Sequence, residues 1–186
     1  MSYNSPFLLL TVGVLCLHTV VGVNIISRAQ WGARAPTSTS YLSNGLSIAV
    51  IHHTASAYCS TQADCSQQVR IIQKYHMDSS GWDDIGYNFL IGGDGQVYEG
   101  RGWNIVGAHV TKRNSKSIGI SFIGNYNNNR PTAAQITAAK ALLATAVSKG
   151  QLKSDYALYG HRHFKATECP GNNLYNEIKT WPRFKV

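Results

Sequence analysis

The distribution of apolar residues predicts short buried strands that alternate with amphipathic helices. Apolar runs of this length, bounded by turn residues, are typical of strands covered on both faces. We expect strands at 23–27, 46–52, 87–92, 96–100 and 117–124, and the end of another at 156–159. The sequence Gly-Asp-Gly at 93–95 predicts a tight hairpin between two of them.

Helical periodicity predicts two long helices. Val69, Ile72 and His76 recur at spacings of three and four within a helix expected at 62–77. Thr132 and Gln135 form a capping-box sequence ahead of an Ala/Leu-rich segment that Gly150 would end. A turn or helix is expected to begin at 28–31, and a final helix is expected to span 174–180.

These elements predict a single α/β domain with one central sheet and helices on its faces. The chain has 186 residues, which suffices for one well-buried domain and is short for two. No repeat, low-complexity segment or linker divides residues 23–186.

The N-terminal segment predicts export. Residues 7–21 are almost all apolar and include no Lys, Arg, Asp or Glu. This run is too short for a comfortable transmembrane helix, and small residues at 20–22 suit signal-peptidase cleavage. We therefore expect a signal peptide at 1–22, a mature domain at 23–186 and an extracellular location; an uncleaved anchor is the alternative.

The charge balance favours an anionic partner. The chain carries 17 basic and 9 acidic residues, a formal net charge of +8. A secreted basic protein meets anionic surfaces such as bacterial walls. This sequence has no dense Lys/Arg stripe, zinc-finger spacing or aromatic RNA-binding motif, so nucleic acid is not expected as a partner. After signal cleavage we expect a monomer without a membrane partner.

The cysteines indicate one local disulfide and one remaining thiol. Cys16 leaves with the signal peptide, so Cys59, Cys65 and Cys169 remain. Cys59 and Cys65 can close a small loop, and an oxidising compartment favours that bond. Cys169 is then left for an intermolecular bridge, a reactive group or a metal ligand.

His161 and Cys169, eight residues apart in a polar loop, suggest part of a zinc site. A third ligand is available in His52, at the carboxyl end of a predicted strand, where α/β sheets place binding groups. Two histidines and a cysteine would leave a fourth position for water, as in catalytic zinc sites. The alternatives are a structural histidine, a buried free thiol, or a thiol hydrolase that uses Cys169 with His161.

Ordered motifs along nearly the whole mature chain resemble the peptidoglycan recognition proteins, in particular their short secreted insect members with amidase activity. The matching segments are 25–27 with 30–32, 50–54, Cys59 with Cys65, 81–82 with 84–89, 91–95 with 98–102, 107–109, 117–120 and 160–171. The resemblance implies a central mixed β-sheet flanked by helices, similar to phage-type zinc N-acetylmuramoyl-L-alanine amidases.

The resemblance also implies an activity and its residues. Zinc would be held by His52, His161 and Cys169, with a catalytic role for Tyr87 and an auxiliary one for Thr167. The reaction would be hydrolysis of the amide between N-acetylmuramic acid and L-alanine in bacterial peptidoglycan, in innate immunity. Family members that only bind peptidoglycan commonly lack the cysteine, so its presence favours an enzyme over a non-catalytic receptor.

The resemblance places a set of residues along the groove for the glycopeptide. They are His53, His76, Gly81, Trp82, Tyr87, His109 and Asn114. Gly81 with Trp82 accompanies a preference for meso-diaminopimelic-type peptidoglycan in this family. Simpler structural roles are open for several: His76 and Trp82 could belong to the core, and Asn114 to a turn.

Two features of the 160–171 loop stay open. The general base is undecided, because Thr167 is a poor base and the stronger base Glu168 would point away from its neighbours in an extended loop. His163 stands where the family often has glutamine, either as a group that hydrogen-bonds a metal ligand or as an extra imidazole that competes for metal.

Overall fold

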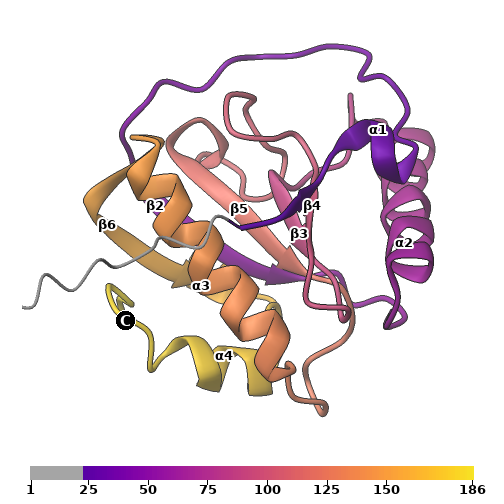
Figure 1. Ribbon diagram of the computed structural model, residues 1–186. Helices are drawn as coiled ribbons and strands as arrows, with labels where there is room; N and C mark the ends of the chain where they lie inside the picture. The colour runs from indigo at the N-terminus through magenta and orange to yellow at the C-terminus, as the bar shows by residue number, and fades with distance from the viewer. Residues whose placement is uncertain (1–22) are drawn as a thin grey trace, which may run out of the picture.

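A mixed β-sheet of six strands forms the centre of the structure, a computed structural model that describes residues 23–186 (Figure 1). The strands are β1 (Ile25–Ile26), β2 (Leu46–His53), β3 (Phe89–Ile91), β4 (Val97–Glu99), β5 (Ser117–Phe122) and β6 (Leu152–Gly160), in the order β1-β4-β3-β5-β2-β6. Only β3 and β4 pair antiparallel among these described strands; the other neighbours are parallel. The predicted α/β fold with a mixed sheet is confirmed.

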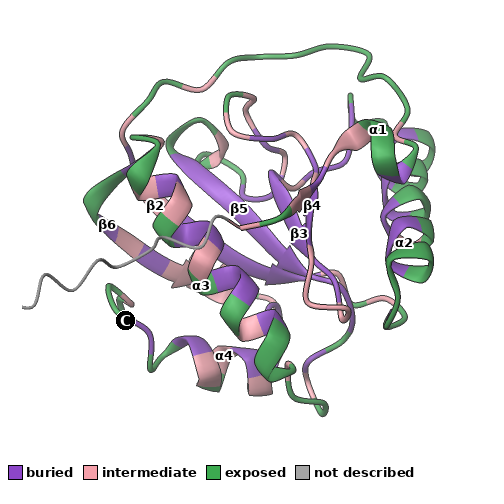
Figure 2. Ribbon diagram, viewed as in Figure 1, coloured by how far each residue is buried: buried purple, intermediate pink, exposed green. Residues whose placement is uncertain are grey.

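Helices cover both faces of the sheet. They are α1 (Arg28–Trp31), α2 (Gln62–Lys74), α3 (Ala133–Ser148) and α4 (Asn172–Ile178), with a π-helical turn η1 (Tyr75–Ser79) and 3₁₀ turns η2 (Asn114–Lys116) and η3 (His161–His163). Successive strand residues point to opposite faces. Phe89 and Ile91 therefore pack with residues of α3 and α4, while Leu90 packs with residues of α1 and α2. The strands between these layers are the most buried part of the molecule (Figure 2).

Local sequence signals account for most element boundaries. The Thr132 hydroxyl accepts a hydrogen bond from the Gln135 backbone N–H, and the Gln135 side-chain oxygen accepts one from the Thr132 backbone N–H, so the predicted capping box is confirmed. The predicted helix at 62–77 ends as an α-helix at Lys74 and continues as the π-helical η1, which carries His76. The strand expected to end at 156–159 begins earlier, at Leu152.

The parallel direction of three strands places the candidate site at one edge of the sheet. β2 is parallel to both β5 and β6, so the carboxyl ends of these three strands meet at one edge of the sheet. This is where α/β proteins bind ligands. Beside this edge, the predicted disulfide is present between Cys59 and Cys65, at the start of α2.

The predicted signal peptide, residues 1–22, lies outside the described residues. From residue 23 onward, no helix has the length and apolar content that a membrane crossing requires.

Candidate metal centre and adjoining cleft

His52 and His161 become neighbours through the pairing of β2 with β6. Ile51 pairs with Gly160, and each is followed by one of the two histidines. The imidazole centroids lie 4.5 Å apart. A pairing between strands separated by about a hundred positions thus brings together two of the three ligands predicted from sequence.

Cys169 reaches the same point because the loop after β6 folds back on itself. The Arg162 backbone N–H donates to the Cys169 carbonyl at 3.0 Å. The Cys169 sulfur accepts a hydrogen bond from the His53 backbone N–H at 3.4 Å and lies 3.7 Å from Nδ1 of His52.

The three side chains could together hold a metal ion such as zinc. Their ligand atoms all lie within 4.8 Å of one another, and no other such group occurs in residues 23–186. Tetrahedral zinc with ordinary Zn–N and Zn–S bond lengths separates nitrogen from sulfur by roughly 3.6 Å. The 3.7 Å between His52 Nδ1 and Cys169 Sγ matches that separation.

The protonation states of the metal-free cluster also suit a cation. Burial lowers the pKa of His52 well below its ordinary value, and His109 and His161 lower it further. Burial, followed by the Lys165 charge, lowers the pKa of His161, while burial raises the pKa of the Cys169 thiol to about 12. Both imidazoles are thus neutral and able to ligate. The thiol keeps its proton until a cation replaces it.

Tyr87 lies beside this cluster, with its ring centroid 5.4 Å from that of His52. Burial, and then the negative charge of a Cys169 thiolate, raises the pKa of the Tyr87 hydroxyl above its ordinary value. Tyr87 is therefore a hydrogen-bond donor over the whole physiological range.

Thr167 and Glu168 occupy different environments in the ligand loop. The Thr167 hydroxyl accepts a hydrogen bond from the Cys169 backbone N–H at 3.2 Å. Glu168 is exposed, and its carboxylate accepts a hydrogen bond from the Asn127 side chain at 2.7 Å. That contact holds Glu168 outside the metal cluster.

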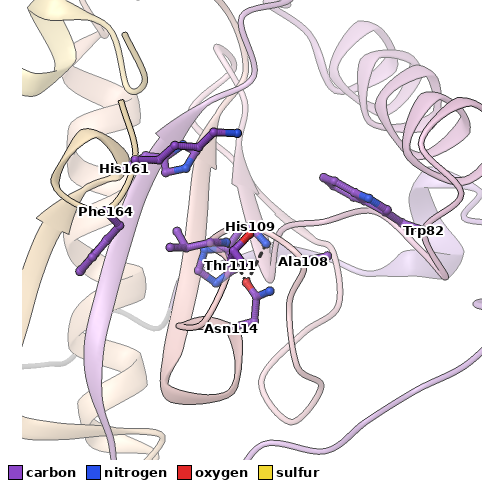
Figure 3. Close-up of a pocket in the computed structure, with 9 residues that line it drawn as sticks. Trp82, Ala108, His109, Thr111, Asn114, His161 and Phe164 are labelled. Atoms are coloured by element: carbon purple, nitrogen blue, oxygen red, sulfur yellow. Dashed lines mark hydrogen bonds between the residues drawn. The ribbon is translucent and has the colours of Figure 1, made fainter. Parts of the chain in front are cut away.

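A cleft of about 350 Å³ opens next to His161 (Figure 3). It is lined by Trp82, Ala108, His109, Val110, Thr111, Asn114, His161, Phe164 and Lys165. Three of the residues expected to contact substrate, Trp82, His109 and Asn114, line it. Sequence reasoning missed Phe164 and Lys165, although both belong to the loop that carries the candidate ligands.

His76 stands behind the cleft and supports its wall. The Trp82 side chain is partly exposed, and its ring stacks on that of His76 at 4.6 Å. The His76 Nδ1 accepts a hydrogen bond from the Gly86 backbone N–H at 3.0 Å. Burial, with a smaller effect of the Arg101 charge, lowers the pKa of His76 to about 4. Gly81 lies in the exposed turn between His76 and Trp82.

His53 and Asn114 make structural hydrogen bonds. His53 is buried, is not among the residues lining the cleft, and accepts a hydrogen bond at Nδ1 from the Tyr126 backbone N–H at 3.2 Å. The Asn114 side-chain oxygen accepts from the backbone N–H groups of His109 and Val110, at 2.9 and 2.8 Å (Figure 3). Asn114 thus fixes the turn that forms one wall of the cleft.

His163 belongs to an aromatic cluster outside the metal group. Its Nδ1 lies 3.0 Å from the Gly160 carbonyl, and its ring packs against Tyr159, Tyr175 and Phe184. Arg101 has a structural role near the cleft loop, because its guanidinium donates to the carbonyls of Ile85 and Val106 at 2.8 and 2.9 Å.

Comparison with known proteins gives the family. The family profile described as N-acetylmuramoyl-L-alanine amidase matches residues 43–172. Peptidoglycan-recognition protein SC2 of Drosophila melanogaster is 63% identical over 183 residues, which cover 98% of this chain and 99% of that one. The chain belongs to the peptidoglycan-recognition protein family.

Solved structures of other peptidoglycan-recognition proteins share the fold. Drosophila PGRP-LB has a TM-score of 0.86 at 43% identity, covering 88% of this chain and 96% of that one. Peptidoglycan recognition protein-LE has a TM-score of 0.85 at 43% identity, covering 87% and 95%. That structure is a complex with tracheal cytotoxin, a monomeric diaminopimelic acid-type peptidoglycan.

Proposed function

We propose that this peptidoglycan-recognition protein is a secreted, zinc-dependent N-acetylmuramoyl-L-alanine amidase of innate immunity. The observation that carries the proposal is the convergence of His52, His161 and Cys169 within 4.8 Å, next to the cleft. Three protein ligands are one fewer than structural zinc sites use, and this is the composition of catalytic sites.

In this mechanism His52, His161 and Cys169 would hold the zinc ion. A zinc ion supplies a Lewis acid that acidifies water and polarises an amide carbonyl. Tyr87, kept protonated by burial, donates a hydrogen bond to the oxygen on which negative charge develops. Thr167, whose hydroxyl accepts a hydrogen bond from the Cys169 backbone N–H, helps to orient the ligand loop.

The cleft would bind the glycopeptide through a few polar groups on aromatic walls. Trp82 and Phe164 offer flat apolar surfaces, and Lys165 adds a positive charge suited to an acidic peptide. We assign a preference for the meso-diaminopimelic type on the Gly81–Trp82 pair. The complex of the related protein-LE with a diaminopimelic-type fragment supports this assignment.

The thiol-hydrolase alternative conflicts with the electrostatics of Cys169. A nucleophilic cysteine needs a lowered pKa and access to substrate. Here burial raises the pKa of the Cys169 thiol to about 12. Metal ligation is the role that this environment favours.

The deciding experiment measures release of dye-labelled peptidoglycan by protein that has been stripped with a chelator and then supplied with zinc. We expect activity to disappear on stripping and to return with zinc. A thiol hydrolase would stay active without metal. A non-catalytic receptor would bind muropeptide in calorimetry but release no dye in either state.

A further inference from the structure

The His109 ring packs closely against two glycines, Gly107 and Gly119. A Cβ atom placed on Gly107 or on Gly119 would come within 2.5 Å of the His109 ring, a separation that real Cβ atoms do not show. Glycine at both positions therefore allows the ring to rest directly on β5, beside His52. The ring is buried, with 8% of the residue exposed.

Both nitrogens of this ring have partners within the protein. Nδ1 lies 3.1 Å from Nε2 of His52, and Nε2 lies 3.4 Å from the Ser117 hydroxyl. The Ser117 hydroxyl in turn donates to the Arg113 carbonyl at 2.9 Å. His109 therefore reaches the cleft with the edge or face of its ring, while its two polar atoms are already engaged.

The donor and acceptor of each hydrogen bond in this series follow from its last acceptor, the Arg113 carbonyl. A carbonyl only accepts hydrogen bonds, so the Ser117 proton points to Arg113 and its oxygen accepts from Nε2–H of His109. His109 Nδ1 then carries no proton and accepts from Nε2–H of His52. His52 is left with an unprotonated Nδ1, the atom that lies 3.7 Å from the Cys169 sulfur.

We propose that His109 is a positioning residue for the candidate metal ligand His52, and that the chain His52–His109–Ser117 fixes the His52 tautomer that presents Nδ1 to the metal. Ligating histidines usually donate their second ring N–H to a carboxylate, a backbone carbonyl or water, which orients the ring and raises its basicity. Here the unprotonated Nδ1 of His109 takes the place of that acceptor. The proposal rests on the proposed metal site and gives His109, which also lines the cleft, a role beyond the substrate contact expected from sequence.

Two readouts test the proposal without using enzymatic activity. Long-range ¹H–¹⁵N correlation spectra of the zinc-loaded protein report which ring nitrogens carry protons. Competition with a chromophoric chelator gives the zinc affinity. We expect Nε2–H on both His52 and His109, with Nδ1 of His52 bound to the metal. A spectrum with the proton on His109 Nδ1 would overturn the proposal.

Three variants separate positioning from packing. His109→Leu removes the acceptor and should lower zinc affinity 10- to 100-fold. His109→Asn returns an acceptor oxygen near the former Nδ1 and should restore most of that affinity. Ser117→Ala keeps the imidazole but removes its partner, and should cost roughly 3- to 10-fold. Thermal unfolding of the metal-free variants verifies that each is folded.

The outcomes also separate this proposal from the proposed function. Unchanged zinc affinity in both His109→Leu and Ser117→Ala, with muropeptide binding lost in His109→Leu, would show that His109 contacts substrate instead. If the zinc affinities follow the expected order but the wild type releases no dye from peptidoglycan, the positioning role stands and the amidase assignment fails.

Discussion

The sulfur of Cys169 lies 3.7 Å from Nδ1 of His52, although 117 positions separate the two residues in the chain. The backbone N–H of His53, the residue after His52, donates to the same sulfur at 3.4 Å. The backbone at the end of β2 thus helps to position Cys169 in the candidate metal centre.

Replacing Cys169 with serine should abolish hydrolysis and spare binding. Serine is a poor zinc ligand at neutral pH, and the cleft residues lie elsewhere, so we expect at least a roughly 100-fold loss of peptidoglycan hydrolysis. Muropeptide affinity, measured by calorimetry, should stay within a few-fold of the wild type. Equal losses of both in a folded variant would contradict the assignment of Cys169 as a ligand.

Tyr87→Phe removes only a hydroxyl from the edge of the metal cluster. If that hydroxyl donates to the developing oxyanion, its loss should raise the activation barrier by about 3 kcal/mol, a rate loss of roughly 100-fold. Steady-state kinetics should show the loss in kcat with little change in KM. A variant with an unchanged kcat would exclude Tyr87 from the reaction.

Trp82→Ala removes an aromatic wall of the cleft. We expect muropeptide affinity to fall roughly 10-fold, since buried aromatic contact contributes more than 1 kcal/mol at such sites. Zinc affinity should not change. Tyr41→Ala is the matched control, because Tyr41 is 77% exposed and does not line the cleft. A comparable loss in both variants would show that the effect of Trp82 is not local.

His76 should make the fold sensitive to mild acid. Its pKa is lowered to about 4 by burial and by Arg101, against the opposing effect of Asp84, and its ring stacks on Trp82. Below about pH 6.5 the unfolded chain binds a proton that the folded chain does not bind until about pH 4. Stability contributed by neutral His76 is therefore lost as the pH falls through this window.

Denaturant unfolding at pH 7 and pH 5, in the presence of a chelator, tests that dependence. His76→Asn keeps an acceptor for the Gly86 N–H without the titration, and should reduce the loss of stability between the two pH values by about 1–2 kcal/mol. Tyr75→Phe, at the exposed neighbouring position, should behave as the wild type does. An identical pH dependence in wild type and His76→Asn would refute the role of His76.

The Cys59–Cys65 disulfide closes a short loop, with a sequence separation of 6. Replacing both residues with serine should lower the free energy of unfolding by about 2 kcal/mol, because the unfolded chain regains conformational freedom. Urea unfolding under oxidising conditions measures this loss. Under reducing conditions the wild type and the double variant should become similar, and a difference that persists would point to lost packing instead.

Local chemistry made much of the fold predictable. The Thr132–Gln135 capping box and the helical spacing of Val69, Ile72 and His76 are short-range patterns that the structure reproduces. The order of strands was not predictable in the same way. The position of β6 beside β2 depends on contacts between segments about a hundred residues apart, and no local pattern encodes them.

The candidate site could be predicted only in part from the sequence, because it too depends on contacts between segments far apart in the chain. Spacing and residue chemistry indicated His52, His161 and Cys169, because few other side chains ligate zinc. The partners of His109 could not be read from the chain. Its contact with His52 depends on two glycines, Gly107 and Gly119, whose effect appears only when the loop folds over β5. Likewise the burial of His53 against Tyr126 became visible only in three dimensions.

The positions of the three candidate ligands also bear on how the folded state would depend on its surroundings. One ion bound by residues 52, 161 and 169 would cross-link β2 to the loop at 160–171, and only the folded chain brings these three ligands together. Free zinc at 100 times its dissociation constant would then add about 2.7 kcal/mol of stability. Resistance to heat and proteolysis would then rise and fall with the concentration of free zinc around the protein.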